Sequence, residues 1–140
     1  MSAEERRGRF DRAVAYFNAR RFFDAHEDWE EIWHECEGAN RLWMQGLIQY
    51  AAAFVHLTRG FYANGFTRLM EQATEKVRSY DGDTERMRWD LFWDDVQPWI
   101  EHGKKVAAGA DLTADAPGDP PVIRYEDGFV PAPLPLEDCS

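Results

Sequence analysis

The stretch RLWMQGLIQYAAAFVHLTRG, residues 41–60, decides the fold. It contains no carboxylate and no lysine, and apolar side chains occupy most directions around its helical axis. This pattern is typical of a helix buried at the centre of a domain, so we predict a central helix over about residues 40–60. Three polar side chains, Gln45, Gln49 and His56, fall on one stripe of this helix at about 100° per residue.

Polar groups inside a core need hydrogen-bond partners, because each one left unpaired would cost roughly 1–3 kcal/mol. The preceding segment HEDWEEIW, residues 26–33, offers such partners. In a helix, its His26 and Glu30 lie one turn apart at the edge of an apolar stripe. We therefore expect a cluster of His, Glu and Gln side chains between two antiparallel helices.

Composition and charge narrow the class of protein. A chain of 140 residues, of which 44% are hydrophobic, suits a single domain with one core. It has no apolar run of about eighteen residues, and its N-terminal MSAEERRGRF lacks an apolar signal region, so we expect a cytoplasmic protein. The net charge of −10 argues against nucleic acid or a membrane as a partner.

The basic residues are thirteen arginines but only three lysines. Abundant carboxylates with few lysines are typical of a protein adapted to high salt, in which the repulsion between like charges is screened. A GC-rich genome would also favour arginine, so both explanations stay open.

The cysteines carry no redox or zinc pattern. Cys36 and Cys139 belong to no C-x-x-C pair, so reduced thiols are expected in a cytosolic chain. Cys36 lies on an apolar face, where burial raises the pKa of a thiol and makes it a poor nucleophile. The sequence leaves open whether the two cysteines interact.

Periodicity and capping residues predict five helices in an irregular all-α bundle. Their expected ranges are residues 3–19, 24–38, 40–60, 64–80 and 95–109. Asp24 is the expected N-cap of the second helix and Asn40 that of the third. Pro98 is expected in the first turn of the fifth helix, and the preceding residues 85–93 are ambiguous.

The second helix has an apolar face that includes Trp29 and Ile32. Three acidic residues are expected to face away from it: Asp28, Glu31 and Glu35. The short link to the third helix predicts that these two helices pack antiparallel.

After residue 109 the composition changes, which divides the chain into a helical domain, 1–109, and a C-terminal segment, 110–140. Six of the seven prolines fall between Pro117 and Pro135, which excludes further long helices. Ile123 and Tyr125 are nevertheless too apolar for a solvated tail. We predict an extended strap that lies on the bundle.

The joint motif of the second and third helices resembles the family known as domain of unknown function 309, small all-helical proteins of bacteria, archaea and plastid lineages. The family pattern is His-Glu-x-x-Glu-x-x-Trp, then Arg-x-x-x-Gln-Gly-x-Ile-Gln, then His-x-x-x-Gly. The matching residues are His26, Glu27, Glu30, Trp33, Arg41, Gln45, Gly46, Ile48, Gln49, His56 and Gly60. The resemblance covers roughly residues 10–80; it implies a helical bundle and no established activity.

Two interpretations of the polar cluster follow from the residues. In the first, the protein is a helical binding or scaffold module, and the cluster only fixes the register of two packed helices. In the second, the cluster is a site for a small molecule, with His26, Glu27 and Glu30 as candidate catalytic residues. The candidate ligand-binding residues are Trp33, Arg41, Gln45, Gln49 and His56. We favour the first interpretation; whether the protein is an enzyme, binds a small molecule or forms a homo-oligomer stays open.

Metal chemistry has little support in the sequence, and we expect neither a metal nor a cofactor. The motif lacks the second histidine of the zinc peptidase pattern H-E-x-x-H. Di-iron bundles need two Glu-x-x-His pairs and two further glutamates, whereas the third helix carries no carboxylate. A single ion held by His26, Glu30 and His56 is the weaker alternative.

Overall fold

The chain folds into five helices, as the sequence predicts. The structure is a computed structural model that describes residues 1–58, 63–80, 87–109 and 117–126. The helices are α1 (Ala3–Asn18), α2 (Phe22–Trp33), α3 (Gly38–Thr58), α4 (Ala63–Arg78) and α5 (Trp89–Ala107). Within these ranges the only strand-like pairing is an isolated antiparallel bridge between Met87 and Tyr125. The fold is all-α, and none of the described helices is both long and apolar enough to cross a membrane.

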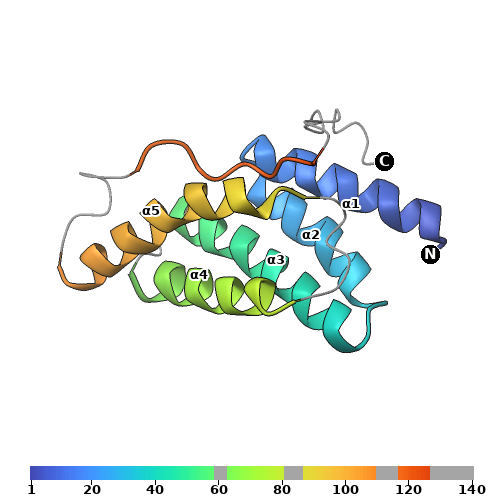
Figure 1. Cartoon of the computed structure of the whole chain (residues 1–140), viewed down its shortest axis with the longest axis horizontal. Helices are drawn as coiled ribbons and strands as arrows, with labels where there is room; N and C mark the ends of the chain where they lie inside the picture. Colours follow the sequence, from blue (N-terminus) through green and yellow to red (C-terminus); the bar gives the residue numbers. More distant parts are fainter. Residues whose placement is uncertain (59–62, 81–86, 110–116, 127–140) are drawn as a thin grey trace.

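Helix α3 lies at the centre of the bundle, between α2 and α4, and its main contacts are with these two helices (Figure 1). Its core-facing side holds large apolar side chains such as Leu47 and Phe54, both fully buried. The opposite side, which carries Gln45, Gln49 and His56, is only half-buried. The polar stripe therefore borders the core instead of lying inside it.

Helix α2 begins at Phe22, two residues before the predicted N-cap at Asp24. The reason is packing, because the buried Phe22 ring stacks on Phe54 with ring centroids 5.0 Å apart and meets Phe17 edge-on at 5.2 Å. Asp24 instead lies in the first turn and pairs with Arg21 at 3.0 Å.

The third and fifth helices also begin earlier than predicted. Helix α3 begins at Gly38, so Asn40 is part of the helix and not its cap. Helix α5 begins at Trp89, which places Pro98 in the helix interior instead of the first turn. Trp89 and Phe92 extend the apolar stripe upstream and pack edge-to-face with centroids 5.2 Å apart. The predicted turn at residues 81–84 lies outside the described residues.

Asp28 was predicted to face away from the core, and this prediction is wrong. Its carboxylate is buried and accepts two hydrogen bonds from Arg12 of α1, from Nε at 2.7 Å and from Nη2 at 2.6 Å. The periodicity of α2 shows only one apolar stripe, but α1 packs against a second side of the helix. The ion pair satisfies the buried carboxylate on that side, while Glu31 and Glu35 are exposed as expected.

The described part of the C-terminal segment, residues 117–126, lies along α1 and α5 (Figure 1). Ile123 and Tyr125 are buried. The main chain of Ile123 donates to Asn18 Oδ1 at 2.7 Å and accepts from Asn18 Nδ2 at 2.9 Å. Trp99 Nε1 of α5 donates to the Asp119 carbonyl at 3.1 Å. These contacts agree with an extended strap over this range, and the remainder of the predicted strap lies outside the described residues.

Helices α3 and α4 come unusually close at Gly46. A Cβ built on Gly46 would lie 2.7 Å from Val77 Cγ2 and 3.2 Å from the backbone oxygen of Ala73, both on α4. A glycine inside a helix costs about 1 kcal/mol relative to alanine. At Gly46 this cost is offset by the close approach of the two helices.

Gly46→Ala should therefore lower the free energy of unfolding by about 1–3 kcal/mol, because the added methyl group overpacks the interface. Gly8, in α1, is the matched control, since a Cβ there would meet nothing within 4 Å. Gly8→Ala should raise stability by roughly 0.5–1 kcal/mol through helix propensity alone. Urea denaturation of both variants measures the difference; equal effects at the two positions would refute the close approach at Gly46.

The buried pair Arg12–Asp28 gives a second prediction. Asp28→Ala should lower the free energy of unfolding by about 1–3 kcal/mol, because it removes the buried carboxylate and the two charge-assisted hydrogen bonds that it accepts from Arg12. Glu31→Ala, on the exposed side of the same helix, should change stability by no more than about 0.5 kcal/mol. Thermal and urea unfolding of the two variants would show the contrast, and an Asp28→Ala protein as stable as Glu31→Ala would contradict it.

Candidate functional site

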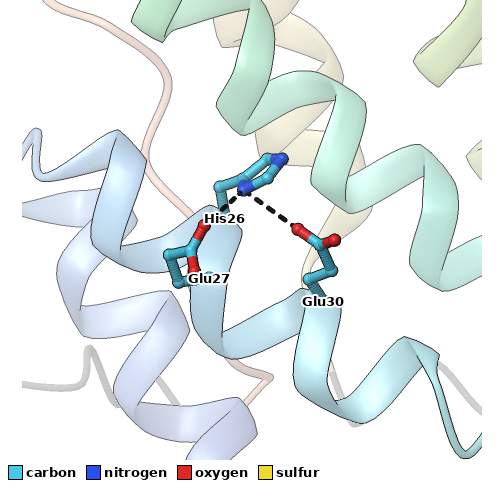
Figure 2. A group of neighbouring side chains, drawn as sticks. All are labelled: His26, Glu27 and Glu30. Carbon is cyan, nitrogen blue, oxygen red and sulfur yellow. Dashed lines mark ion pairs between the residues drawn. The ribbon is translucent and has the colours of Figure 1, made fainter.

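Two carboxylates of α2, those of Glu27 and Glu30, lie close to Nδ1 of His26 on the same helix. This atom lies 3.4 Å from Glu27 Oε1 and 3.4 Å from Glu30 Oε2. Figure 2 shows His26 and Glu30 pointing from α2 toward α3, while Glu27 approaches the imidazole from the other side. The ligand-type atoms of the three residues all lie within 4.8 Å of one another. We call these three residues the α2 triad.

The environment of His26 Nδ1 is unusual. The atom itself is buried, and among the described residues it has no hydrogen-bond partner, although two carboxylate oxygens lie nearby. The side chain as a whole is 26% exposed, whereas those of Glu27 and Glu30 are 56% and 39% exposed. The triad is therefore open to solvent on its acidic side and closed on its imidazole side. Phe23 covers the ring, nearly parallel to it, with centroids 6.3 Å apart.

Gln49 does not pair with His26 or Glu30, the partners that the sequence suggested for the polar stripe. Its Nε2 donates to Gln72 Oε1 at 3.1 Å, and its Oε1 accepts from Lys76 Nζ at 2.9 Å, so both ends of the amide are bound to α4. Burial lowers the pKa of Lys76 below its usual value. Gln72 and Lys76 were absent from the predicted cluster, but their i, i+4 spacing on the side of α4 that meets α3 is the signal that identifies them.

The other two members of the predicted stripe also lie on the half-buried side of α3. His56 packs against Gly65 of α4, where an added Cβ would lie 3.3 Å from His56 Nδ1. Gln45 is half-buried one turn before Gln49. The structure thus separates the predicted cluster into the triad on α2 and a group centred on Gln49 at the contact with α4.

Arg41 and Trp33, both predicted to bind ligand, contact each other. The guanidinium of Arg41 lies 3.8 Å from the centroid of the Trp33 ring, which is within the range of a cation–π contact. Its Nη1 also donates to the carbonyl oxygens of Trp33 at 3.3 Å and Cys36 at 3.4 Å. The last carbonyls of a helix lack partners within the helix, so Arg41 closes the end of α2.

Cys36 behaves as the sequence suggested. Its thiol is half-buried and donates to the Ile32 carbonyl at 3.3 Å. Burial is the main cause that raises the pKa of this thiol, while Arg6 and Arg41 nearby act in the opposite direction. A raised pKa leaves little thiolate at neutral pH, which agrees with the prediction of a poor nucleophile.

Comparison with known proteins gives one match. Residues 10–69 match the family described as domain of unknown function (DUF309). The matched range runs from Phe10 of α1 into α4, and it contains the α2 triad together with the polar stripe of α3. No curated protein and no solved structure matches the chain. Residues 10–69 of this chain are therefore similar to the DUF309 family, whose function is not known.

Proposed function

We propose that the α2 triad binds one divalent transition-metal ion, and that the protein is a small helical metal-binding module. The observation that carries this proposal is the position of His26 Nδ1, a buried nitrogen without a hydrogen bond at 3.4 Å from each of two carboxylates. One imidazole nitrogen and two carboxylate oxygens this close together are a suitable set of ligands for a divalent cation.

The spacing of the three groups supports this proposal. A tetrahedral zinc site has metal–ligand bonds of about 2.0–2.1 Å, which separate neighbouring ligand atoms by about 3.3–3.4 Å. The two distances from His26 Nδ1 equal that separation. Imidazole with carboxylates suits Zn²⁺ and related ions. Two carboxylates also balance the 2+ charge of the ion, so its binding buries no net charge.

Three protein ligands leave one position of a tetrahedral ion open. In zinc proteins this arrangement is typical of sites where the ion also holds water or a small molecule, whereas purely structural ions have four protein ligands. The exposed sides of Glu27 and Glu30 would give a small molecule access to that position. A small-molecule ligand of the module would accordingly bind through the metal.

This proposal departs from the expectation of no metal. It also differs from the weaker alternative of the sequence analysis, because Glu27 takes the place of His56. His56 packs against Gly65 on α4, while Glu27 lies beside His26. The weaker alternative from the sequence, a site of His26, Glu30 and His56, requires the polar stripe of α3 to face α2. With Glu27 in place of His56, all three ligands come from a single turn of one helix.

For the group around Gln49 we retain the structural interpretation. Both ends of its amide are bound to α4, and Lys76 is held by the same amide. An amide bound at both ends to the neighbouring helix supports a role in fixing the register of α3 against α4. The scaffold role favoured from the sequence is thereby assigned to Gln49, and the binding role to the α2 triad.

We further infer a cytoplasmic protein that binds neither nucleic acid nor membranes. The net charge of −10 supports this inference, because anionic partners would be repelled. The same excess of carboxylates with only three lysines supports adaptation to a cytoplasm of high salt concentration. The surface charge would then serve solvation and not the binding of a substrate.

Isothermal titration calorimetry of the metal-free protein with ZnCl₂ tests the metal site. We expect one ion per chain, and we expect His26→Ala to abolish this binding because it removes the only nitrogen ligand. Glu31→Gln, which removes an exposed charge one residue beyond the triad, should leave the affinity unchanged within about twofold, since surface charges act weakly. Binding that survives His26→Ala, or that Glu31→Gln removes equally, would refute the site.

His56→Ala separates the two possible ligand sets. The α2 triad predicts that this variant binds Zn²⁺ as the parent does, whereas a site built from His26, Glu30 and His56 predicts loss of binding. Circular dichroism of each variant confirms that the helices are intact before the titration.

A further inference from the structure

The C-terminal end of α1 has an arginine at a position where glycine is usual. The amide of Arg21 donates to the Tyr16 carbonyl at 2.8 Å, and the amide of Arg20 donates to the Phe17 carbonyl at 3.0 Å. These two bonds form a Schellman motif, in which the residue just beyond the helix end takes a left-handed backbone. Arg20 takes that place with a φ of 65°, and among the described residues it is the only one besides glycine with a positive φ.

The side chain of Arg20 gives a reason for its presence at this position. A left-handed backbone is unfavourable for a residue with a Cβ, whereas glycine adopts it without steric cost. The guanidinium of Arg20 forms an ion pair with the carboxylate of Asp119, 99 residues away in the sequence. Arg20 therefore makes a contact with the C-terminal segment that glycine could not make.

Residues 117–126 lie along both α1 and α5, and we call them the bridging segment (Figure 1). On the α1 side, the main chain of Ile123 exchanges two hydrogen bonds with the Asn18 side chain. On the α5 side, the Asp119 carbonyl accepts from Trp99 Nε1 at 3.1 Å. The bridging segment thus ties the last turn of α1 to the middle of α5.

Side chains supply most of the hydrogen bonds that hold the bridging segment. Within the described ranges, only one bond joins its main chain to main chain elsewhere, from the Arg88 amide to the Arg124 carbonyl at 2.8 Å. Helices α1 and α5 share little direct contact besides the rings of Phe17 and Phe92, with centroids 6.3 Å apart. An element with so few main-chain bonds opens more readily than the helices around it.

We propose that the bridging segment opens from α1 and α5 as one unit while the five helices stay folded, and that the ion pair of Arg20 with Asp119 keeps it closed. The left-handed backbone of Arg20 is retained because its side chain makes this pair. Opening exposes the apolar surface that the buried Ile123 and Tyr125 cover in the closed state. The fold thereby carries a conformational switch, which does not depend on the metal site.

Native-state hydrogen exchange of the full-length chain tests whether the bridging segment opens as a unit. We expect the Ile123 amide and the Trp99 indole proton to have the same protection factor, because one opening exposes both. That factor should be lower than the protection of the Leu47 amide in the central helix α3, which stays folded. Different protection of Ile123 and Trp99, or protection equal to that of Leu47, would overturn the opening.

Arg20→Gly tests the ion pair and the strained backbone in one variant. The protection of Ile123 and Trp99 should fall about two- to fivefold, the effect of losing an exposed ion pair. The urea midpoint of global unfolding should stay the same or rise, because glycine fits the left-handed backbone. General destabilisation would lower both quantities, so their divergence is specific to this role of Arg20.

Asp119→Ala removes the partner and keeps the carbonyl that Trp99 uses. It should lower the protection of the bridging segment by the same factor as Arg20→Gly, and the double variant should lower it no further. The matched control is Asp24→Ala, which breaks the neighbouring pair of Arg21 with Asp24 and should leave this protection unchanged. Unchanged protection in Arg20→Gly, or additive losses in the double variant, would overturn the role of the ion pair.

Discussion

The close approach of α3 and α4 at Gly46 is the constraint on which the rest of the site depends. With no side chain at this position, Val77 and the backbone of Ala73 come within van der Waals contact of α3. The same approach brings Gln72 and Lys76 within hydrogen-bonding distance of Gln49. The half-buried side of α3 is thereby joined to α4, and a larger residue at Gly46 would push these polar groups apart.

The polar residues of the motif fall into two places in the structure. The Gln49 amide is bound to Gln72 and Lys76 of α4, whereas the imidazole of His26 lies 3.4 Å from two carboxylates of its own helix. The proposed metal site therefore needs ligands from α2 alone, and the proposed role of Gln49 is to fix α3 against α4.

Helix α2 is held in place by contacts on two sides and at its C-terminal end. One side packs against α3 through Phe22, whose ring stacks on Phe54, and a second side is held to α1 by the ion pair of the buried Asp28 with Arg12. Its C-terminal end is closed by Arg41, which stacks on Trp33. A helix fixed on two sides and at its end holds its exposed carboxylates in place, and such rigidity favours a preorganised site.

The sequence by itself determined the five helices and the central place of α3, because helical periodicity and composition are local properties of the chain. Only the tertiary structure decided which neighbour each polar side chain meets. Periodicity places Gln49 and Asp28 on a side of a helix, but the helix that packs there is chosen by the whole core. Gln49 therefore meets α4 instead of Glu30, and Asp28 is buried against Arg12 instead of facing solvent. The early start of α5 has the same origin, since the Arg88 amide is bound by the Arg124 carbonyl, 36 residues away in the sequence.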